Sequence, residues 1–538
     1  MYKNDKLLIG KSNDKELSIL LNKANRHGLI TGASGSGKTI TSKVMAESFS
    51  DAGIPVFLAD VKGDMAGTAL EGESNEALAS RLQKLGIEDF EFKSFPVRFW
   101  DLFGTHGHPI RTSLDSVGPE ILSMMLGLSE AQEGVLTVVY KIAKDNGWEL
   151  DDIKDLRLLL QYVGDNREQF TTRYGNVTPQ TVGVIQRCLL ALENQGGDKF
   201  FGQPELDIND FIGTDANGKG YINILHAVEL FESPDLFASF LLWLLTTLYN
   251  KMPEVGDLDK PKVVFFFDEA HLLFNGMPVY RLKRITQVVK LIRSRGIGLY
   301  FISQSPTDVP DEILAQLGNR VQHSLRAYTP SEQKAVKAAA GAFRVNPKFD
   351  TEKAILELGT GEALISFQDE KGAPEVVERA TILPPQSLMG AIDGITRNKV
   401  INTSPLCGKY DEIVDAESAA EVLQQMADTK LAEENARVEA EAAEKQQIAA
   451  EKAAEKAANE QAKLAEKERI AAQKAAEKAE AERIKAEERR RIAAEKEAKK
   501  AKEKSQKVKD RVLGNILGSA GSTIGRKITD KILKDIFK

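Results

Sequence analysis

One stretch near the start of the chain constrains its fold more than any other: HGLITGASGSGKTITS, from His27 to Ser42. A short apolar run comes first, a turn of glycines and small residues follows, and a Lys-Thr pair opens a segment with a helical pattern. The residues from Gly32 to Thr39 fit the pattern G-x-x-x-x-G-K-[ST] of phosphate-binding loops. Because such a loop joins a strand to a helix, this stretch predicts an α/β fold built around a nucleotide site.

Each residue type in this loop has a chemical reason to be there. Glycines let backbone N–H groups turn inward around phosphate oxygens, and the N-terminus of the following helix favours an anion. Lys38 can reach the β and γ phosphates, and the hydroxyl of Thr39 can bind Mg²⁺. We therefore expect ATP and Mg²⁺ as cofactors, with the nucleotide bound by Gly32, Ala33, Ser34, Gly35, Ser36, Gly37, Lys38 and Thr39.

A second motif, KPKVVFFFDEAH, runs from Lys260 to His271 and consists of an apolar strand followed by two acids. This pattern is typical of the strand that carries the metal-binding acid in ATPases with a phosphate loop. Asp268 is the expected Mg²⁺ ligand, and Glu269 is the expected group that polarises the attacking water. The alternative is that the acids only cap the next helix.

The segment GIPVFLADVKGDMAG, from Gly53 to Gly67, predicts another core strand that ends at Asp60. Lys62 and Asp64 follow directly. Ligands of open α/β sheets bind at the carboxyl ends of the strands, so these side chains are candidates for the site. A role in capping the loop is the alternative.

A basic helix end, a glycine turn and a buried strand follow one another in KLIRSRGIGLYFISQSP, from Lys290 to Pro306. Gln304 ends the strand and is expected to contact the γ-phosphate or the water. Arg293 and Arg295 are candidates for a phosphate contact in the same subunit or in a neighbouring one. Cations at a helix C-terminus are the alternative, and the same ambiguity holds for Arg320 and Arg326.

Composition limits the cellular setting. The formal net charge is -7, which gives no sign of nucleic-acid binding by bulk charge, although a basic lining inside a ring would not show in that figure. The two cysteines, Cys188 and Cys407, lie far apart, as in a reducing cytoplasm. The most apolar run, Leu236 to Tyr249, is shorter than the roughly 20 residues of a membrane span, so a buried core helix is expected.

The chain divides by composition into six segments. Residues 1–68 and 260–390 form the two predicted parts of the ATPase core, and residues 69–259 form a mostly helical insertion between them. Residues 391–415 are a predicted linker. Residues 416–508 consist mainly of Ala, Glu, Lys, Arg and Gln and contain neither Gly nor Pro, whereas residues 509–538 form an amphipathic tail.

The charged segment predicts one long helix, because its residue types form helices well and Glu and Lys recur four positions apart. Large apolar residues keep no strict heptad, so a solvated single helix is favoured over an alanine-lined coiled coil. Three interpretations of the tail stay open: packing on the chain's own globular part, an oligomerisation helix, and a helix on a membrane surface.

These motifs together resemble the HerA-like helicase and translocase proteins of the HerA–FtsK branch of P-loop ATPases, over most of the chain to about Pro385. The resemblance implies a RecA-like core, a hexameric ring, ATP bound between subunits and movement of double-stranded DNA. Archaeal HerA carries a β-barrel ahead of its ATPase core, and the residues before His27 are too few for one. Partnership with the nuclease that binds near that barrel is therefore not predicted.

Three functions follow as hypotheses. The first is an ATP-driven ring motor on double-stranded DNA, with Arg167 and Arg173 of DNREQFTTRYGN as candidate basic residues of a pore. The second is a coupling ATPase for protein export or secretion, with the tail as a docking element. The third is a nucleotide-switched scaffold in which the charged helix is a spacer.

Overall fold

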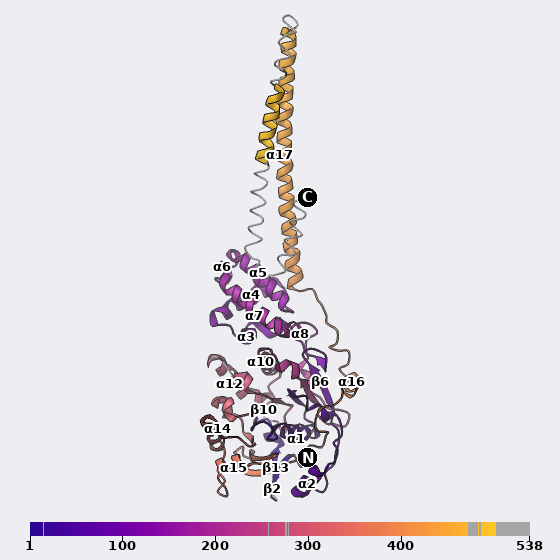
Figure 1. The fold of residues 1–538 in the computed structure, drawn as a ribbon, viewed down its shortest axis with the longest axis vertical. Helices are drawn as coiled ribbons and strands as arrows, with labels where there is room; N and C mark the ends of the chain where they lie inside the picture. Colours follow the sequence, from indigo (N-terminus) through magenta and orange to yellow (C-terminus); the bar gives the residue numbers. More distant parts are fainter. Residues whose placement is uncertain are drawn as a thin grey trace. The chain divides into compact units, whose positions relative to one another are not determined.

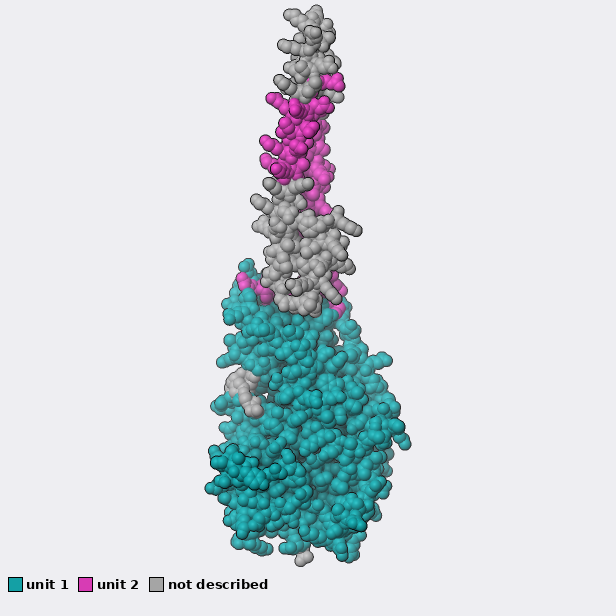
Figure 2. All heavy atoms as spheres, in the orientation of Figure 1, with its two compact units in different colours: residues 1–160, 168–420 teal, residues 161–167, 421–538 magenta. Residues whose placement is uncertain are grey.

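The computed structural model describes residues 1–13, 15–256, 258–274, 277, 279–471, 483 and 486–501. The chain divides into two compact units, which Figure 2 shows in different colours. Residues 1–160 and 168–420 form the first unit, and residues 161–167 and 421–538 form the second. All the predicted residues of the nucleotide site fall in the first unit.

The first unit is built on one 13-stranded sheet with the order β1-β2-β13-β12-β11-β4-β10-β9-β5-β8-β6-β7, and β3 pairs with β2. The strands from β11 to β7 in this order are all parallel to their neighbours. They are β11 (Asn319–Gln322), β4 (Gly28–Thr31), β10 (Ile297–Ser303), β9 (Val263–Phe267), β5 (Val56–Asp60), β8 (Ile222–His226), β6 (Val97–Asp101) and β7 (His108–Pro109).

The predicted α/β fold with a RecA-like P-loop core is confirmed by this arrangement. The strand that leads into the phosphate loop, β4, does not touch the strand that carries the acids, β9, because β10 lies between them. The remaining strands are antiparallel and close one edge: β12 (Glu362–Ser366), β13 (Glu378–Ile382), β2 (Lys6–Ser12), β3 (Lys15–Leu20) and β1 (Tyr2–Lys3).

Aromatic side chains show why the central strands are buried on both faces. Successive side chains of a strand point to opposite faces of the sheet. On one face, Phe266 of β9 stacks on Tyr300 of β10 with ring centroids 5.2 Å apart, and Phe49 of helix α1 (Lys38–Asp51) packs against both rings. On the other face, Phe267 stacks on Phe301 at 5.7 Å. A parallel sheet covered on both faces needs such continuous apolar runs.

Helices and short connections surround these strands. After the acids come α11 (His271–Phe274) and α12 (Val279–Ile292), and after β10 come η6 (Pro306–Asp308) and α13 (Asp311–Leu314). Helices α14 (Pro330–Gly341) and α15 (Thr351–Glu357) share a small core of their own, which includes Leu325, Phe343 and Ile355.

The segment 69–259, predicted as a mostly helical insertion, also contributes β6, β7 and β8 to the sheet. Its helices α3, α4, α7 and α8 gather at one end of the first unit in Figure 1. Helix α10 contacts both α3 and α12. The helices of the segment are α2 (Glu76–Leu85), α3 (Leu114–Met125), α4 (Glu130–Asn146), α5 (Ile153–Asp165), α6 (Arg167–Tyr174), α7 (Pro179–Leu192), α8 (Asp198–Phe200), α9 (Val228–Phe231) and α10 (Pro234–Lys251).

Helix α10 contains the most apolar run of the sequence and is buried along most of its length, as expected for a core helix. Within the described ranges, no helix combines the length and apolar character that crossing a membrane requires.

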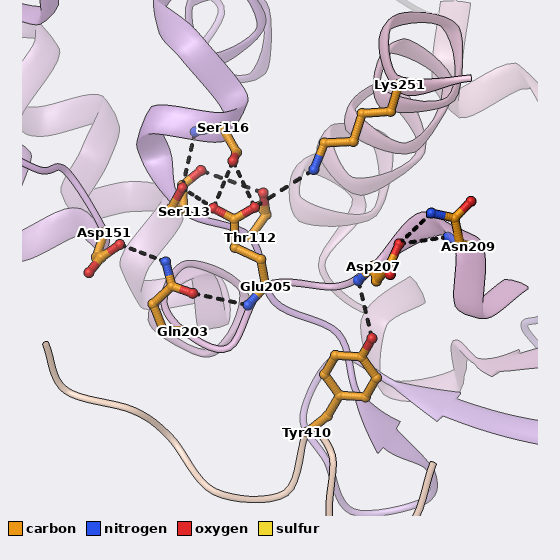
Figure 3. Close-up of polar contacts among 10 residues, drawn as sticks. All are labelled: Thr112, Ser113, Ser116, Asp151, Gln203, Glu205, Asp207, Asn209, Lys251 and Tyr410. Atoms are coloured by element: carbon orange, nitrogen blue, oxygen red, sulfur yellow. Dashed lines mark hydrogen bonds and ion pairs between the residues drawn. The ribbon is translucent and has the colours of Figure 1, made fainter. Parts of the chain in front are cut away.

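A polar cluster connects the start of α3 to Glu205, which lies in the connection after α8 (Figure 3). Ser113 caps α3 by accepting a hydrogen bond from the N–H of Ser116 at 3.0 Å. The hydroxyls of both serines donate to the carboxylate of Glu205, and the ammonium of Lys251 lies 3.8 Å from it. Polar contacts therefore join the start of α3, the connection that contains Glu205 and the end of α10.

The predicted linker, residues 391–415, packs against the first unit. It contains α16 (Gly394–Asn402) and the buried side chain of Tyr410. The ring centroids of Tyr410 and Trp100 are 5.8 Å apart. Arg111 donates to the carbonyl of Tyr410, and Ser418 further on donates to Asp155 at 2.6 Å. Residues 384–420, which include α16, thus form a strap along the core of the first unit.

The second unit consists mainly of α17 (Ala419–Ala471), whose side chains are exposed over most of its length. Residues 486–501 are helical as well. The part of the predicted charged helix between these segments lies mostly outside the described residues, and the predicted amphipathic tail, residues 509–538, lies wholly outside them.

Candidate nucleotide-binding site

Parallel strands bring the predicted site residues to one edge of the sheet. Ser303 of β10 pairs in register with Thr31 of β4, and Phe301 pairs with Phe267 of β9. The phosphate loop, Gln304 and Asp268 each follow the carboxyl end of one of these strands, and Asp60 is the last residue of β5. They meet at the edge where ligands of open α/β sheets bind.

Two glycines of the phosphate loop are required by close contacts. Gly37 has φ +117°, and a Cβ there would lie 3.2 Å from the backbone nitrogen of Gly361. Gly32 has φ +156°, and a Cβ there would lie 2.5 Å from the Cβ of His323. The backbone at these positions therefore excludes side chains, which leaves the inner face of the loop to N–H groups.

Lys38 is the first residue of α1 and points back over the loop. Its ammonium donates to the carbonyl of Gly32 at 2.6 Å and to that of Ala33 at 3.2 Å. Desolvation lowers the pKa of Lys38, and the carboxylates of Asp268 and Glu269 oppose that change. The lysine and the two acids therefore share one electrostatic environment, as catalysis at a phosphate would require.

Asp268 follows β9 and accepts a hydrogen bond from the N–H of Glu269 at 2.8 Å. Desolvation and then the neighbouring Glu269 raise the pKa of Asp268 to about 6, and Lys62 and Lys38 oppose the rise. A bound cation would reverse this shift, since positive charge stabilises the carboxylate.

Glu269 has an unusual backbone and an unusual side chain. Its φ is +49°, a left-handed conformation that costs a residue other than glycine about 1–3 kcal/mol. Its Oε2 is buried and has no hydrogen bond within the described structure, although Nδ1 of His271 lies 3.2 Å away. Strain and an unsatisfied buried oxygen at one residue are typical of a functional position.

A pocket opens beside these residues, between α1 and the ends of β5 and β9. Its polar lining comes from Thr39, Ser42, Asp60, Lys62, Asp64 and Asp268. Hydroxyl and carboxylate oxygens are the ligands that Mg²⁺ prefers, and a lysine suits a phosphate. The chemistry of these residues therefore fits Mg²⁺ and a phosphate group.

The hydrogen bonds of Asp60 decide between the two roles predicted for its segment, binding at the site and capping of the loop. Its carboxylate accepts from the N–H groups of Gly63, Asp64 and Met65, at 2.8, 3.1 and 3.0 Å. Asp101 holds the loop after β6 in the same way. Asp60 thus caps its own loop, and through that loop it positions Lys62 and Asp64 at the pocket.

The candidate arginines lie elsewhere. Arg293 and Arg295 form η5 (Arg293–Arg295), which precedes β10 and so lies about 20 Å, the length of a seven-residue strand, from the edge with the phosphate loop. Arg295 donates to the carbonyl of Met252 and lies over the ring of Tyr249 at 4.4 Å. This placement excludes a contact with the phosphate site of the same subunit, and only the contact with a neighbouring subunit stays a prediction.

Arg320 and Arg326 differ from each other. Arg320 donates to the carbonyls of Leu317, Leu314 and Ala342, at 3.1, 2.9 and 3.0 Å, so its role is structural. Arg326 is exposed in the loop after β11.

The sequence did not indicate that two residues, Asp308 and His323, lie beside the phosphate loop. Asp308 accepts from the hydroxyl of Ser303 at 2.5 Å and from the N–H of Ser305 at 3.0 Å, and its charge acts on Lys38. The spacing of Ser305 and Asp308 is that of a capping box, which is a signal for a helix start and not for a site. His323 fills the space beside Gly32, and no local pattern marks it.

A phosphate loop after β4, an Asp-Glu pair after β9, and β10 lying between these two strands define a P-loop ATPase. The sequence model of the family described as "Helicase HerA-like C-terminal" matches residues 5–493. The chain belongs to this helicase family.

Curated relatives agree with that placement. The chain is 23% identical over 412 residues to the DNA double-strand break repair helicase HerA of Sulfolobus acidocaldarius, covering 72% of this chain and 71% of the relative. It is 22% identical over 382 residues to the same-named protein of Sulfurisphaera tokodaii, covering 68% and 67%. A probable helicase of Methanocaldococcus jannaschii, MJ1565, is 30% identical over 151 residues, covering 27% and 28%.

Solved structures give weaker similarity. The bacterial conjugative coupling protein TrwB matches with a TM-score of 0.47 and 12% identity, covering 72% of this chain and 91% of that one. VirB4 of Thermoanaerobacter pseudethanolicus matches with a TM-score of 0.45 and 15% identity, covering 71% and 97%.

Proposed function

We propose that this protein is an ATP-hydrolysing motor that assembles as a homo-oligomeric ring, a hexamer, in the cytoplasm and moves or remodels double-stranded DNA. The single observation that carries hydrolysis is Glu269, strained and unsatisfied beside Asp268 at the end of β9. The family and the two relatives named as DNA repair helicases support DNA as the substrate.

The roles of the side chains follow from their positions. The backbone of the phosphate loop and the ammonium of Lys38 bind the phosphates, and Thr39 and Asp268 hold Mg²⁺. When Mg²⁺ is bound, it neutralises charge on the phosphate oxygens. Glu269 orients the attacking water and accepts its proton, and Gln304, exposed directly after β10, contacts the γ-phosphate.

A ring supports a further role for η5. Since Arg293 and Arg295 cannot reach the phosphate site of their own subunit, a role in hydrolysis requires the site of the neighbouring subunit. Within its own subunit, Arg295 binds the carbonyl of Met252 and lies over the ring of Tyr249.

Arg173, a candidate DNA contact in the helical segment, has partners within the chain. Arg173 donates to Asp145 at 3.2 Å and lies over the ring of Tyr174, so its charge is already compensated within the chain. We therefore give Arg173 no leading role in DNA binding.

The test is the rate of ATP hydrolysis by the full chain, with and without duplex DNA, at low salt and at rising salt. We expect DNA to stimulate turnover, and the stimulation to fall with salt because counterion release drives binding to DNA. The variant Glu269→Gln should bind ATP but lose about 100-fold or more in turnover. Turnover that duplex DNA leaves unchanged at low salt would contradict the DNA motor but not the ATPase.

A further inference from the structure

His323 lies directly beside the phosphate loop. The parallel pairing of β11 with β4 continues past the strands, because the N–H of His323 donates to the carbonyl of Thr31 at 2.7 Å. The N–H of Ala33 then donates to the carbonyl of Ser324 at 2.8 Å. The side chain of His323 is fully buried, and it occupies the space that a side chain at Gly32 would need.

The ring of His323 joins two parts of the fold. Nδ1 lies 3.0 Å from the carbonyl oxygen of Glu362, and Nε2 lies 2.8 Å from Oγ1 of Thr41. A carbonyl oxygen can only accept, so Nδ1 carries the proton and Nε2 accepts from the hydroxyl of Thr41. Burial and the charge of Lys38 lower the pKa of His323 to about 4, which keeps the ring neutral and this tautomer in place.

Thr41 belongs to the first turn of α1, three residues after Lys38, and is fully buried. Among the described contacts, the only hydrogen-bond acceptor for its hydroxyl is Nε2 of His323. The position of the first turn of α1 is therefore linked to the ring of His323.

A second contact from the same segment reaches the loop itself. The N–H of Gly361 donates to the carbonyl of Ser36 at 3.0 Å. Gly361 is in turn held by Arg81 of α2, whose guanidinium donates to the carbonyl of Gly361 at 2.6 Å and to that of Ile382 at 3.1 Å. The segment with Gly361 and Glu362 is thus fixed to the sheet edge and touches the phosphate loop and, through His323, the helix that follows.

We infer that His323 is a positioning residue for the nucleotide site. Together with Gly361 and Glu362 it forms a brace that holds the phosphate loop and the first turn of α1 in the shape that binds phosphate. The inference rests on the proposed ATP site. A loop held in its binding shape before the ligand arrives loses less conformational freedom on binding, so a broken brace lowers nucleotide affinity.

The test compares ADP binding, with Mg²⁺ present, by the full-length wild type and the variants His323→Leu, His323→Gln and Thr41→Val. We expect His323→Leu and Thr41→Val each to weaken ADP binding about tenfold, the cost of one lost buried hydrogen bond. His323→Gln retains one donor and one acceptor, so it should stay within about threefold of the wild type. The double variant His323→Leu/Thr41→Val should bind no more weakly than His323→Leu alone, because both changes break one connection.

A matched control comes from the same helix. Ser50 of α1 is fully buried, and its hydroxyl donates to the carbonyl of Gly220 at 2.6 Å, away from the phosphate loop. The variant Ser50→Ala should lower the melting temperature and leave ADP binding and the KM for ATP unchanged.

Wild-type affinity in Thr41→Val would overturn the brace, and so would a loss of affinity in Ser50→Ala as large as that in Thr41→Val. Thr41→Val replaces the hydroxyl by a methyl group of similar size, so its ADP affinity tests the brace even where His323→Leu fails to fold. Absence of ADP binding and of ATP turnover in the wild type would instead overturn the nucleotide site, and the brace with it.

Discussion

Two helices of this protein carry Lys and Glu four residues apart, and the pairs have opposite surroundings. On α17, Lys445 and Glu441 lie 3.4 Å apart with 57% and 55% of their side chains exposed. On α1, Lys43 and Glu47 are 1% and 0% exposed. A spacing of four residues therefore does not by itself distinguish a solvated surface pair from a buried pair that joins two segments.

The buried pair fastens the strap to the helix that begins at the phosphate loop. Glu47 accepts from the N–H of Gln386 at 2.7 Å and from the N–H and hydroxyl of Ser387 at 3.2 and 2.5 Å. The ammonium of Lys43 donates to the carbonyl of Leu388. Burying ions costs several kcal/mol, and such hydrogen bonds are what offset that cost.

The largest effect is expected from Glu47→Ala. It leaves the N–H groups of Gln386 and Ser387 without an acceptor and Lys43 without its opposite charge, which should cost about 3–5 kcal/mol of unfolding free energy. Urea unfolding followed by tryptophan fluorescence measures it, because all three tryptophans lie in the first unit. Glu441→Ala is the matched control, and equal midpoints for the two variants would refute the contrast between the helices.

A smaller loss of unfolding free energy is expected from Lys43→Met, which removes the cation but keeps Glu47 as the acceptor for Gln386 and Ser387. The double variant Lys43→Met/Glu47→Gln removes both charges and retains an oxygen for Gln386 and Ser387. We expect the double variant to be about 1–2 kcal/mol more stable than Lys43→Met, because an unpaired buried charge costs more than a neutral hydrogen-bonded group. Additive losses in the same unfolding measurement would show that the two side chains do not interact.

The buried pair should also make stability depend on pH. Desolvation lowers the pKa of Lys43 from 10.5 to about 8. The folded state therefore binds this proton more weakly than the unfolded chain, so its contribution to stability is present above pH 10.5 and is lost as the pH falls through 8. Between these values the unfolding free energy of the wild type should rise with pH relative to that of Lys43→Met. Parallel pH curves for the two proteins would contradict this expectation.

The smallest effect is expected on α17. Glu441→Ala and Lys445→Ala remove one exposed pair among many, and exposed pairs of this spacing contribute little. The fluorescence midpoint of the first unit should not change measurably, and far-UV circular dichroism should retain the helical signal. A clear loss in either measurement would mean that the charges of α17 contribute more to folding than their exposure indicates.

Local patterns were enough to predict several features. Apolar runs that end at acids, at a polar residue or at the glycines of the phosphate loop identified the strands β4, β5, β9 and β10. The α/β fold with its P-loop core is confirmed. The positions of Lys38, Asp268 and Gln304 after those strands predicted that they would meet, since parallel strands end at one edge. The Gly- and Pro-free segment predicted helix, as α17 shows. The assigned roles of these residues stay predictions.

Only the tertiary structure decided the rest. The order of the strands, the place of β6 and β8 in the sheet, and the packing of the strap depend on contacts between residues far apart in the chain. Glu47 and Ser387, for example, are 340 positions apart. Periodicity reports on neighbours within a turn or a strand, whereas burial of a charge depends on which distant backbone groups satisfy it. The same reason hid His323, whose importance comes from Thr41 and Glu362 and not from its own neighbours in sequence.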